Sequence, residues 1–172
     1  MGYVPNSDLI LQRKPKILKA FAALSAAVND PESTVPRGLK RLIGHVASRA
    51  AGCQYCMAHT AELAHKQGID DRKLAAVWSY QTNPLFTPAE RAALDVAVAA
   101  GTVPNAATDE MFLELKKYWS EEQIVEIVAV IALIGFHNRF NDTMATPLED
   151  EPTHFANDHL AQHGWKIGKH AR

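Results

Sequence analysis

Residues 52–60 have the sequence GCQYCMAHT and hold both cysteines of the chain. Two residues separate Cys53 from Cys56, so on a helix the two sulfurs face each other across one turn. In a cytosolic protein, this C-x-x-C spacing is typical of a redox pair or of half a metal site. The stop signal at Gly68 predicts that the cysteines begin a helix running from about residue 53 to residue 67.

Helix signals continue on both sides of this stretch. Apolar residues recur at three- and four-residue steps, and the chain lacks a convincing alternating run bounded by hairpin turns. Thr87-Pro88-Ala89-Glu90 and Ser120-Glu121-Glu122-Gln123 are strong helix starts, because each combines an N-cap with a capping-box side chain three residues later. We therefore predict an all-α fold, a single compact multi-helix domain, with helices over residues 15–28, 36–51, 53–67, 71–80, 88–100, 108–118 and 121–139.

The 172-residue length suits one domain, which we place at residues 1–148. From about residue 149 the composition becomes acidic and polar, with the histidines His154, His159 and His163 scattered along it. We expect residues 149–172 to form a peripheral polar C-terminal tail whose histidines are solvated.

Composition also excludes several classes of function. The 18 basic and 19 acidic residues give no electrostatic footprint for nucleic acid. The N-terminus lacks the basic-then-apolar order of a signal peptide, so a cytoplasmic location is expected. The longest apolar stretch, residues 124–135, contains Glu126 and is shorter than the ~20 residues of a membrane span, which favours a buried core helix and no membrane association.

The spacing around the cysteines indicates thiol chemistry. A helix N-terminus or a neighbouring cation lowers a thiol pKa by stabilising the thiolate. His59 lies one turn beyond Cys56, where its ring could hydrogen-bond the sulfur or carry its proton, which makes Cys56 the candidate nucleophile. Cys53 would then resolve an oxidised Cys56 by closing a disulfide.

Two other interpretations of the cysteines remain open. They could be a pair of buried apolar residues that happen to lie three apart. They could also be ligands of a structural zinc ion, with further ligands from His59, His45, His65 or the tail, although the chain has no second C-x-x-C pair. We assign no metal or organic cofactor to the chain.

The C-x-Y-C-x-x-H core resembles that of the alkylhydroperoxidase D-like, carboxymuconolactone decarboxylase superfamily. Other motifs follow in the family's order and extend the resemblance over about residues 36–148: Gly68-Ile69-Asp70, Thr87-Pro88-x-Glu90-Arg91, Ser120-x-Glu122 and Asn138-Arg139-Phe140-Asn141. The resemblance implies an all-helical homo-oligomer, a trimer or hexamer, that reduces a hydroperoxide with Cys56 as the peroxidatic and Cys53 as the resolving cysteine. It also implies re-reduction by a lipoyl-type or other dithiol protein.

Two positions depart from the family pattern. Arg41 stands where the family usually has a glutamate of its proton relay, and Thr60 stands where it favours a histidine. His45 lies one helical turn after Arg41, which gives the hypothesis that His45 replaces the missing acid. Besides a peroxidase-type oxidoreductase, the alternatives are a decarboxylase-like lyase acting on a cyclic lactone acid, and a redox-responsive binding module without turnover.

Overall fold

The computed structural model describes residues 2–171; the end residues of the predicted ranges, 1 and 172, lie outside it. Within the described part, the chain forms helices and no strands, which confirms the all-α prediction. Three short 3-10 helices are η1 (Ala76–Ser79), η2 (Ala161–His163) and η3 (Gly168–His170). The α-helices are α1 (Asn6–Leu11), α2 (Pro15–Val28), α3 (Arg37–Ala50), α4 (Gln54–Lys66), α5 (Asp71–Ala75), α6 (Pro88–Gly101), α7 (Asp109–Leu115), α8 (Glu121–Met144) and α9 (Asp150–His159).

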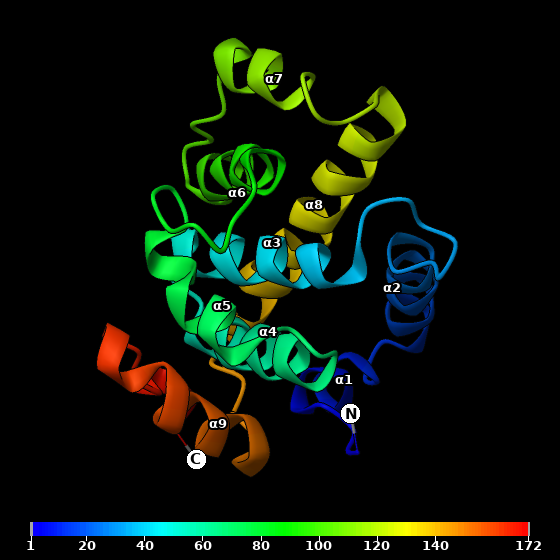
Figure 1. Ribbon diagram of the computed structural model, residues 1–172. Helices are drawn as coiled ribbons and strands as arrows, with labels where there is room; N and C mark the ends of the chain where they lie inside the picture. The colour runs from blue at the N-terminus through cyan, green and yellow to red at the C-terminus, as the bar shows by residue number, and fades with distance from the viewer. Residues whose placement is uncertain (1, 172) are drawn as a thin grey trace.

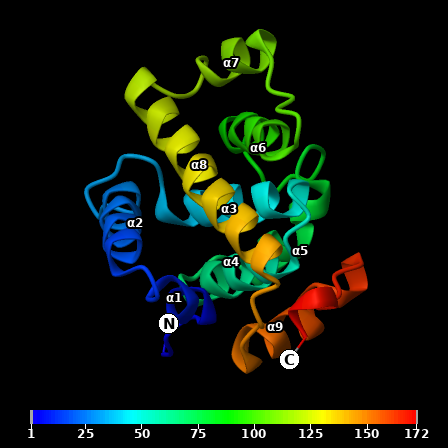
Figure 2. The same ribbon diagram turned by 180° about the vertical axis from the view of Figure 1, so that it is seen from behind.

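Helix α3 lies at the centre of the molecule (Figures 1 and 2). It packs against α6 on one side and α4 on the other, and the long helix α8 crosses it. Fully buried side chains at these contacts, including Leu42 and Ile43 of α3 and Leu94 of α6, form the core. The cysteine helix α4 is therefore anchored on the core by α3 and α8, and α9 packs against it as well.

The predicted helix starts are confirmed in atomic detail. Thr87 Oγ1 accepts from the Glu90 N–H at 3.2 Å, and the Glu90 carboxylate accepts from the Thr87 N–H at 2.9 Å. Ser120 and Gln123 form the same capping box at the start of α8. Both motifs are local, because their partners are three residues apart, and this is why the sequence alone reveals them.

Helix ends differ more from the prediction than helix starts. The helix predicted over residues 71–80 is α5 followed by the tighter 3-10 turn η1, and α7 ends at Leu115 rather than residue 118. Helix α8 continues past Arg139 to Met144, because the polar side chains of Asn138 and Asn141 are buried and so extend its inner face beyond the apolar run.

Helix α8 is only partly the core helix that we predicted. Ile127, Val130 and Leu133 are buried, whereas Val125 is 68% exposed and Phe136 is also exposed. The most apolar 18 residues of this helix have a mean hydropathy of 1.4, and only 33% of that stretch is buried. By length and composition α8 is apolar enough to cross a membrane, and the core helix of a soluble protein passes the same test. Because Val125 and Phe136 are exposed, part of the apolar surface of α8 is left uncovered within one copy of the chain.

Residues 149–171 do not form a peripheral tail, contrary to our expectation. They form α9, η2 and η3, and α9 packs against α4 (Figure 1). Ala156, Leu160 and Trp165 are buried, and the Trp165 indole N–H donates to the Gln54 carbonyl at 3.0 Å. The polar composition concealed a narrow apolar stripe at four-residue spacing, Pro152, Ala156 and Leu160, which is enough to anchor a short helix.

Candidate active site around Cys53 and Cys56

A sharp bend between α3 and α4 positions the two cysteines. Gly52 takes a φ of 76°, in the left-handed region that favours glycine, and the Cys53 N–H donates to the Ser48 carbonyl at 3.1 Å. Cys53 becomes the N-cap of α4, and its sulfur accepts from the Cys56 N–H at 3.3 Å. The predicted position of the pair at the start of a helix is thus confirmed to within one residue.

The two sulfurs differ in their surroundings. A hydrogen bond from the Cys56 side chain, aided by the Cys56 backbone N–H, lowers the pKa of Cys53 in spite of its burial. Burial and the adjacent Cys53 sulfur raise the pKa of Cys56 well above its ordinary value. The Asn141 side-chain amide of α8 lies 3.8 Å from the Cys56 sulfur as a further donor. Of the two cysteines, Cys53 is the one whose thiolate the site stabilises.

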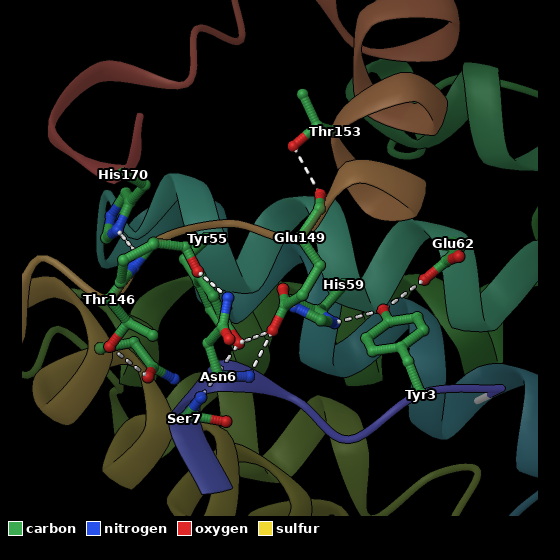
Figure 3. A network of polar contacts seen from close by, with 12 residues as sticks. Tyr3, Asn6, Ser7, Tyr55, His59, Glu62, Thr146, Glu149, Thr153 and His170 are labelled. Carbon is green, nitrogen blue, oxygen red and sulfur yellow. Dashed lines mark hydrogen bonds and ion pairs between the residues drawn. The ribbon is translucent and has the colours of Figure 1, made fainter. Parts of the chain in front are cut away.

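His59 does not bond to Cys56, although it lies one turn away as predicted. Its Nε2 is 2.7 Å from a carboxylate oxygen of Glu149, and its Nδ1 is 3.3 Å from the Tyr3 hydroxyl (Figure 3). Both ring nitrogens are thus occupied by partners other than a sulfur. The Tyr55 hydroxyl donates to the other Glu149 oxygen at 2.9 Å, so one carboxylate joins Tyr55, which precedes Cys56, to His59, one turn after it.

Glu149 is the centre of a polar network that extends beyond α4 (Figure 3). Burial raises its pKa, but the hydrogen bond and charge of His59, together with the Asn6 N–H at 2.5 Å, outweigh burial and leave the pKa below its ordinary value. On the far side of His59, the Tyr3 hydroxyl lies 3.2 Å from Glu62, whose carboxylate pairs with Lys66 at 2.9 Å. The network thus joins the N-terminal segment, α4 and the start of α9.

The residues at the relay positions bond to groups other than the two cysteine sulfurs. His45 Nδ1 faces the Met57 carbonyl at 3.2 Å and the Thr60 hydroxyl at 3.1 Å, and burial lowers the pKa of His45 to about 4. Thr60 donates to the Cys56 carbonyl at 2.7 Å. Arg41 donates to the Gln67 side chain at 3.0 Å. His45 therefore supports the backbone of α4 rather than bonding to a thiol.

Two further histidines, His65 and His137, have partners of their own in the structure. His65, one of the candidate zinc ligands, pairs with Asp71 at 2.6 Å. His137 packs edge-on against Phe21 and lies 3.5 Å from the Asn141 amide, and burial lowers its pKa to about 4. In residues 2–171, no group of three His, Cys, Asp or Glu side chains is arranged to hold a metal ion.

Sequence reasoning missed two residues that complete this site, Asn141 and Glu149. Asn141 belongs to the Asn138-Arg139-Phe140-Asn141 motif, so a signal existed, but a helix-end motif does not reveal what its side chain touches. Glu149 stood at the edge of the expected tail, 90 residues from His59. No local sequence pattern predicts that two residues so far apart form a hydrogen bond.

A family model described as the carboxymuconolactone decarboxylase family matches residues 15–99, the segment that includes α3, α4 and the cysteine pair. The debrominase Bmp8 is 36% identical to this chain and covers 91% of it, the chain covers 83% of Bmp8, and the TM-score is 0.87. The chain belongs to the carboxymuconolactone decarboxylase family. This confirms the predicted superfamily.

Two further proteins resemble this chain, one in sequence and one in fold. The protein YnjA of Escherichia coli is 33% identical over 98 residues, which span 56% of this chain and only about half, 53%, of YnjA. An alkylhydroperoxidase core protein from Ralstonia eutropha has the same fold, with a TM-score of 0.78 at 24% identity, and covers 90% of this chain while the chain covers 81% of it. A cysteine-to-alanine variant of Bmp8 has been solved in complex with 2,3,4-tribromopyrrole. Glu149, Asn141 and Tyr3 all lie outside the segment matched by the family model.

Proposed function

We propose that this protein is a thiol-dependent reductase whose Cys53–Cys56 dithiol delivers two electrons to a small electrophile and closes to a disulfide. One observation carries the proposal: the Cys53 sulfur caps α4 and accepts the Cys56 N–H at 3.3 Å. A sulfur in that position is a stabilised thiolate with a second thiol one turn away. A lone buried cysteine would lack both features.

A hydroperoxide is the first candidate substrate, as the family resemblance implies. The Cys53 thiolate attacks one peroxide oxygen, the O–O bond breaks, and the other oxygen leaves as an alcohol after taking the Cys56 proton. The Cys56 thiolate then attacks the sulfenic sulfur of Cys53. The disulfide forms, and the released hydroxide takes a proton from solvent and leaves as water.

This order exchanges the roles that the resemblance implies, in which Cys56 attacks first. Support for the exchange comes from the lowered pKa of Cys53 and the raised pKa of Cys56. The thiolate, not the thiol, is the nucleophile, so the cysteine that ionises more readily is the better first attacker. Cys56, kept as a thiol by burial, serves as the proton donor and then as the resolving residue.

Reductive debromination is the second candidate, favoured by the likeness to Bmp8 over most of both chains. In that reaction the dithiol loses two electrons and two protons, the carbon–bromine bond breaks, and bromide leaves. The ring carbon takes one of the protons and the other goes to solvent. The same disulfide forms, so both candidates use the same two sulfurs and need an external dithiol protein, for example a lipoyl-type one, for turnover.

Intact-protein mass spectrometry tests the proposal directly. The reduced protein is treated with one equivalent of an alkyl hydroperoxide or of 2,3,4-tribromopyrrole, in wild type, Cys53→Ser and Cys56→Ser. We expect the wild type to lose two hydrogens with one of the two substrates, and Cys56→Ser, but not Cys53→Ser, to gain one oxygen from the hydroperoxide. Trapping in Cys53→Ser instead would restore the order implied by the resemblance, and no disulfide with either compound would refute the proposed function.

Repeated consumption of substrate in the presence of excess dithiol separates a catalyst from a redox-responsive binding module. A catalyst turns over many times, whereas a binding module oxidises once. The decarboxylase-like alternative is separate from both, because it predicts no change of thiol state when a lactone acid is consumed.

A further inference from the structure

Both sulfurs of the dithiol are shielded from solvent. Cys53 is 0% exposed and Cys56 is 3% exposed. A thiolate must reach the reacting atom of its substrate, and the resulting disulfide must later meet a second thiol. If the dithiol works as proposed above, a neighbouring part of the protein has to move aside in each cycle.

The part that covers the cysteine helix is residues 147–171, here called the C-terminal cover. Its helix α9 packs against α4, and the Trp165 indole N–H donates to the carbonyl of Gln54, the residue that follows Cys53. Lys169 pairs with Asp142 of α8 at 2.8 Å, and the charges of both residues act on Cys53. Residues of the cover therefore lie close to Cys53.

One carboxylate fastens the cover to α4. Glu149, at the N-cap of α9, lies 2.7 Å from His59 Nε2 and accepts from the Tyr55 hydroxyl at 2.9 Å, and both partners belong to the cysteine helix α4 (Figure 3). The Asn6 N–H also donates to it, at 2.5 Å, which adds the N-terminal segment to the same fastening. A single side chain thus holds together three segments that are distant in sequence.

Besides the latch, the cover is attached by apolar side chains that join the core, among them Ala156, Leu160 and Trp165. Further polar links to the rest of the chain are a buried hydrogen bond between His170 Nδ1 and the Thr146 carbonyl at 2.8 Å and two ion pairs near the surface, Lys66–Glu151 at 2.7 Å and Lys169–Asp142. Exposed ion pairs contribute little, whereas hydrogen bonds of a buried carboxylate contribute more. Local units of structure open before the whole protein unfolds, so a segment outside the central helices can move without loss of the core.

We propose that residues 147–171 form a movable cover over the Cys53–Cys56 dithiol and that Glu149 is the latch that holds it closed. Glu149 is a positioning residue, because it acts on the site through His59 and Tyr55. In the closed state the cover protects the thiols from adventitious oxidation, and in the open state it admits the substrate and the reductant. The access argument depends on the proposed function, but the latch itself does not.

Thiol alkylation of the full chain, without substrate, tests the latch. In Glu149→Gln the carboxylate charge is lost, and we expect the iodoacetamide rate constant of the cysteines to rise by about tenfold or more, as for loss of a charged hydrogen bond. Tyr55→Phe removes only one latch bond and should give a smaller rise, which keeps the test available if Glu149→Gln folds poorly. Asp70→Asn is the matched control, because Asp70 is an exposed N-cap paired with Arg72 at 2.7 Å, and its amide should leave the rate unchanged.

Amide hydrogen exchange on the same proteins shows where the opening occurs. In Glu149→Gln, exchange should accelerate across residues 150–170 while the α8 amides between residues 124 and 134 keep the wild-type rate. Equal acceleration in both segments would mean global destabilisation and would overturn the proposal, as would an unchanged alkylation rate. A latch that passes these tests in a protein without dithiol reductase activity would refute only the proposed function.

Discussion

The residues around the two cysteines shift the pKa values of their thiols in opposite directions. Cys53 caps α4 and receives hydrogen bonds from Cys56, whereas Cys56 is buried beside that sulfur. Because the shift of Cys53 arises chiefly from its neighbour, the acidity of one thiol depends on the presence of the other. This interdependence is measurable.

Replacing Cys56 by alanine should raise the pH midpoint at which Cys53 becomes reactive toward iodoacetamide. The largest cause of the lowered Cys53 pKa, the hydrogen bond from the Cys56 side chain, is then absent. Cys56→Ser is the matched control, because its hydroxyl remains a donor and should shift the midpoint less. An unchanged or lower midpoint in Cys56→Ala would contradict this account of the thiolate.

At the scale of the elements, the start of α3 is held against α8 by one glutamate. The Glu126 carboxylate accepts from the Thr34 and Val35 N–H groups at 3.3 Å each, from the Ser33 hydroxyl, and from Lys40 at 3.2 Å. The partial burial of Glu126 raises its pKa, but these donors outweigh that effect and lower the pKa from 4.5 to about 2. The loop before the central helix is thereby tied to the longest helix.

Glu126→Gln should destabilise the protein at neutral pH by about 1.5–3 kcal/mol, the range for hydrogen bonds to a charged group. A carboxyl group with a depressed pKa stabilises the fold above its unfolded pKa and loses that effect as the pH falls through its folded pKa. The difference between wild type and variant should therefore shrink as the pH falls from 4.5 toward about 2. Urea unfolding over this pH range measures it.

Glu32→Gln, in the same loop but exposed, is the control for this experiment and should change stability little. A stability difference between wild type and Glu126→Gln that stays constant down to acid pH would show that the charge of Glu126 is not what stabilises the loop.

At the scale of the whole molecule, an apolar surface remains uncovered on α2 and α8. Leu24 of α2, and Val125, Val128 and Phe136 of α8, are exposed side chains. Exposed apolar surface of this kind commonly marks a contact with another chain. The predicted homo-oligomer, a trimer or hexamer, would bury this face against a second copy.

Light scattering after size exclusion checks this expectation. We expect the wild type to exceed the monomer mass of 18.9 kDa, and Val125→Glu to shift the population toward the monomer. Val103→Glu is the matched control, since Val103 is 71% exposed on the loop after α6 and its change should leave the assembly intact. A monomeric wild type would refute the oligomer.

The sequence by itself determined the all-α class, the main helix starts, the placement of the cysteines at the start of a helix, and the family. These features are local, because caps, apolar spacing and the C-x-x-C motif act between residues three or four apart. The polar tail was the clear error, since three apolar residues sufficed to pack a helix that composition suggested would be solvated.

Only the tertiary structure decided what surrounds the sulfurs. Asn141 reaches Cys56 across 85 residues of chain, Glu149 reaches His59 across 90, and Tyr3 reaches His59 across 56. These contacts depend on how α8, α9 and the N-terminal segment pack on α4. Contacts between segments so distant in sequence produce no periodic pattern in a single sequence. Sequence therefore specified the cysteine pair as the candidate for thiol chemistry, while the fold decided which of the two cysteines has the lowered pKa and which side chains surround the pair.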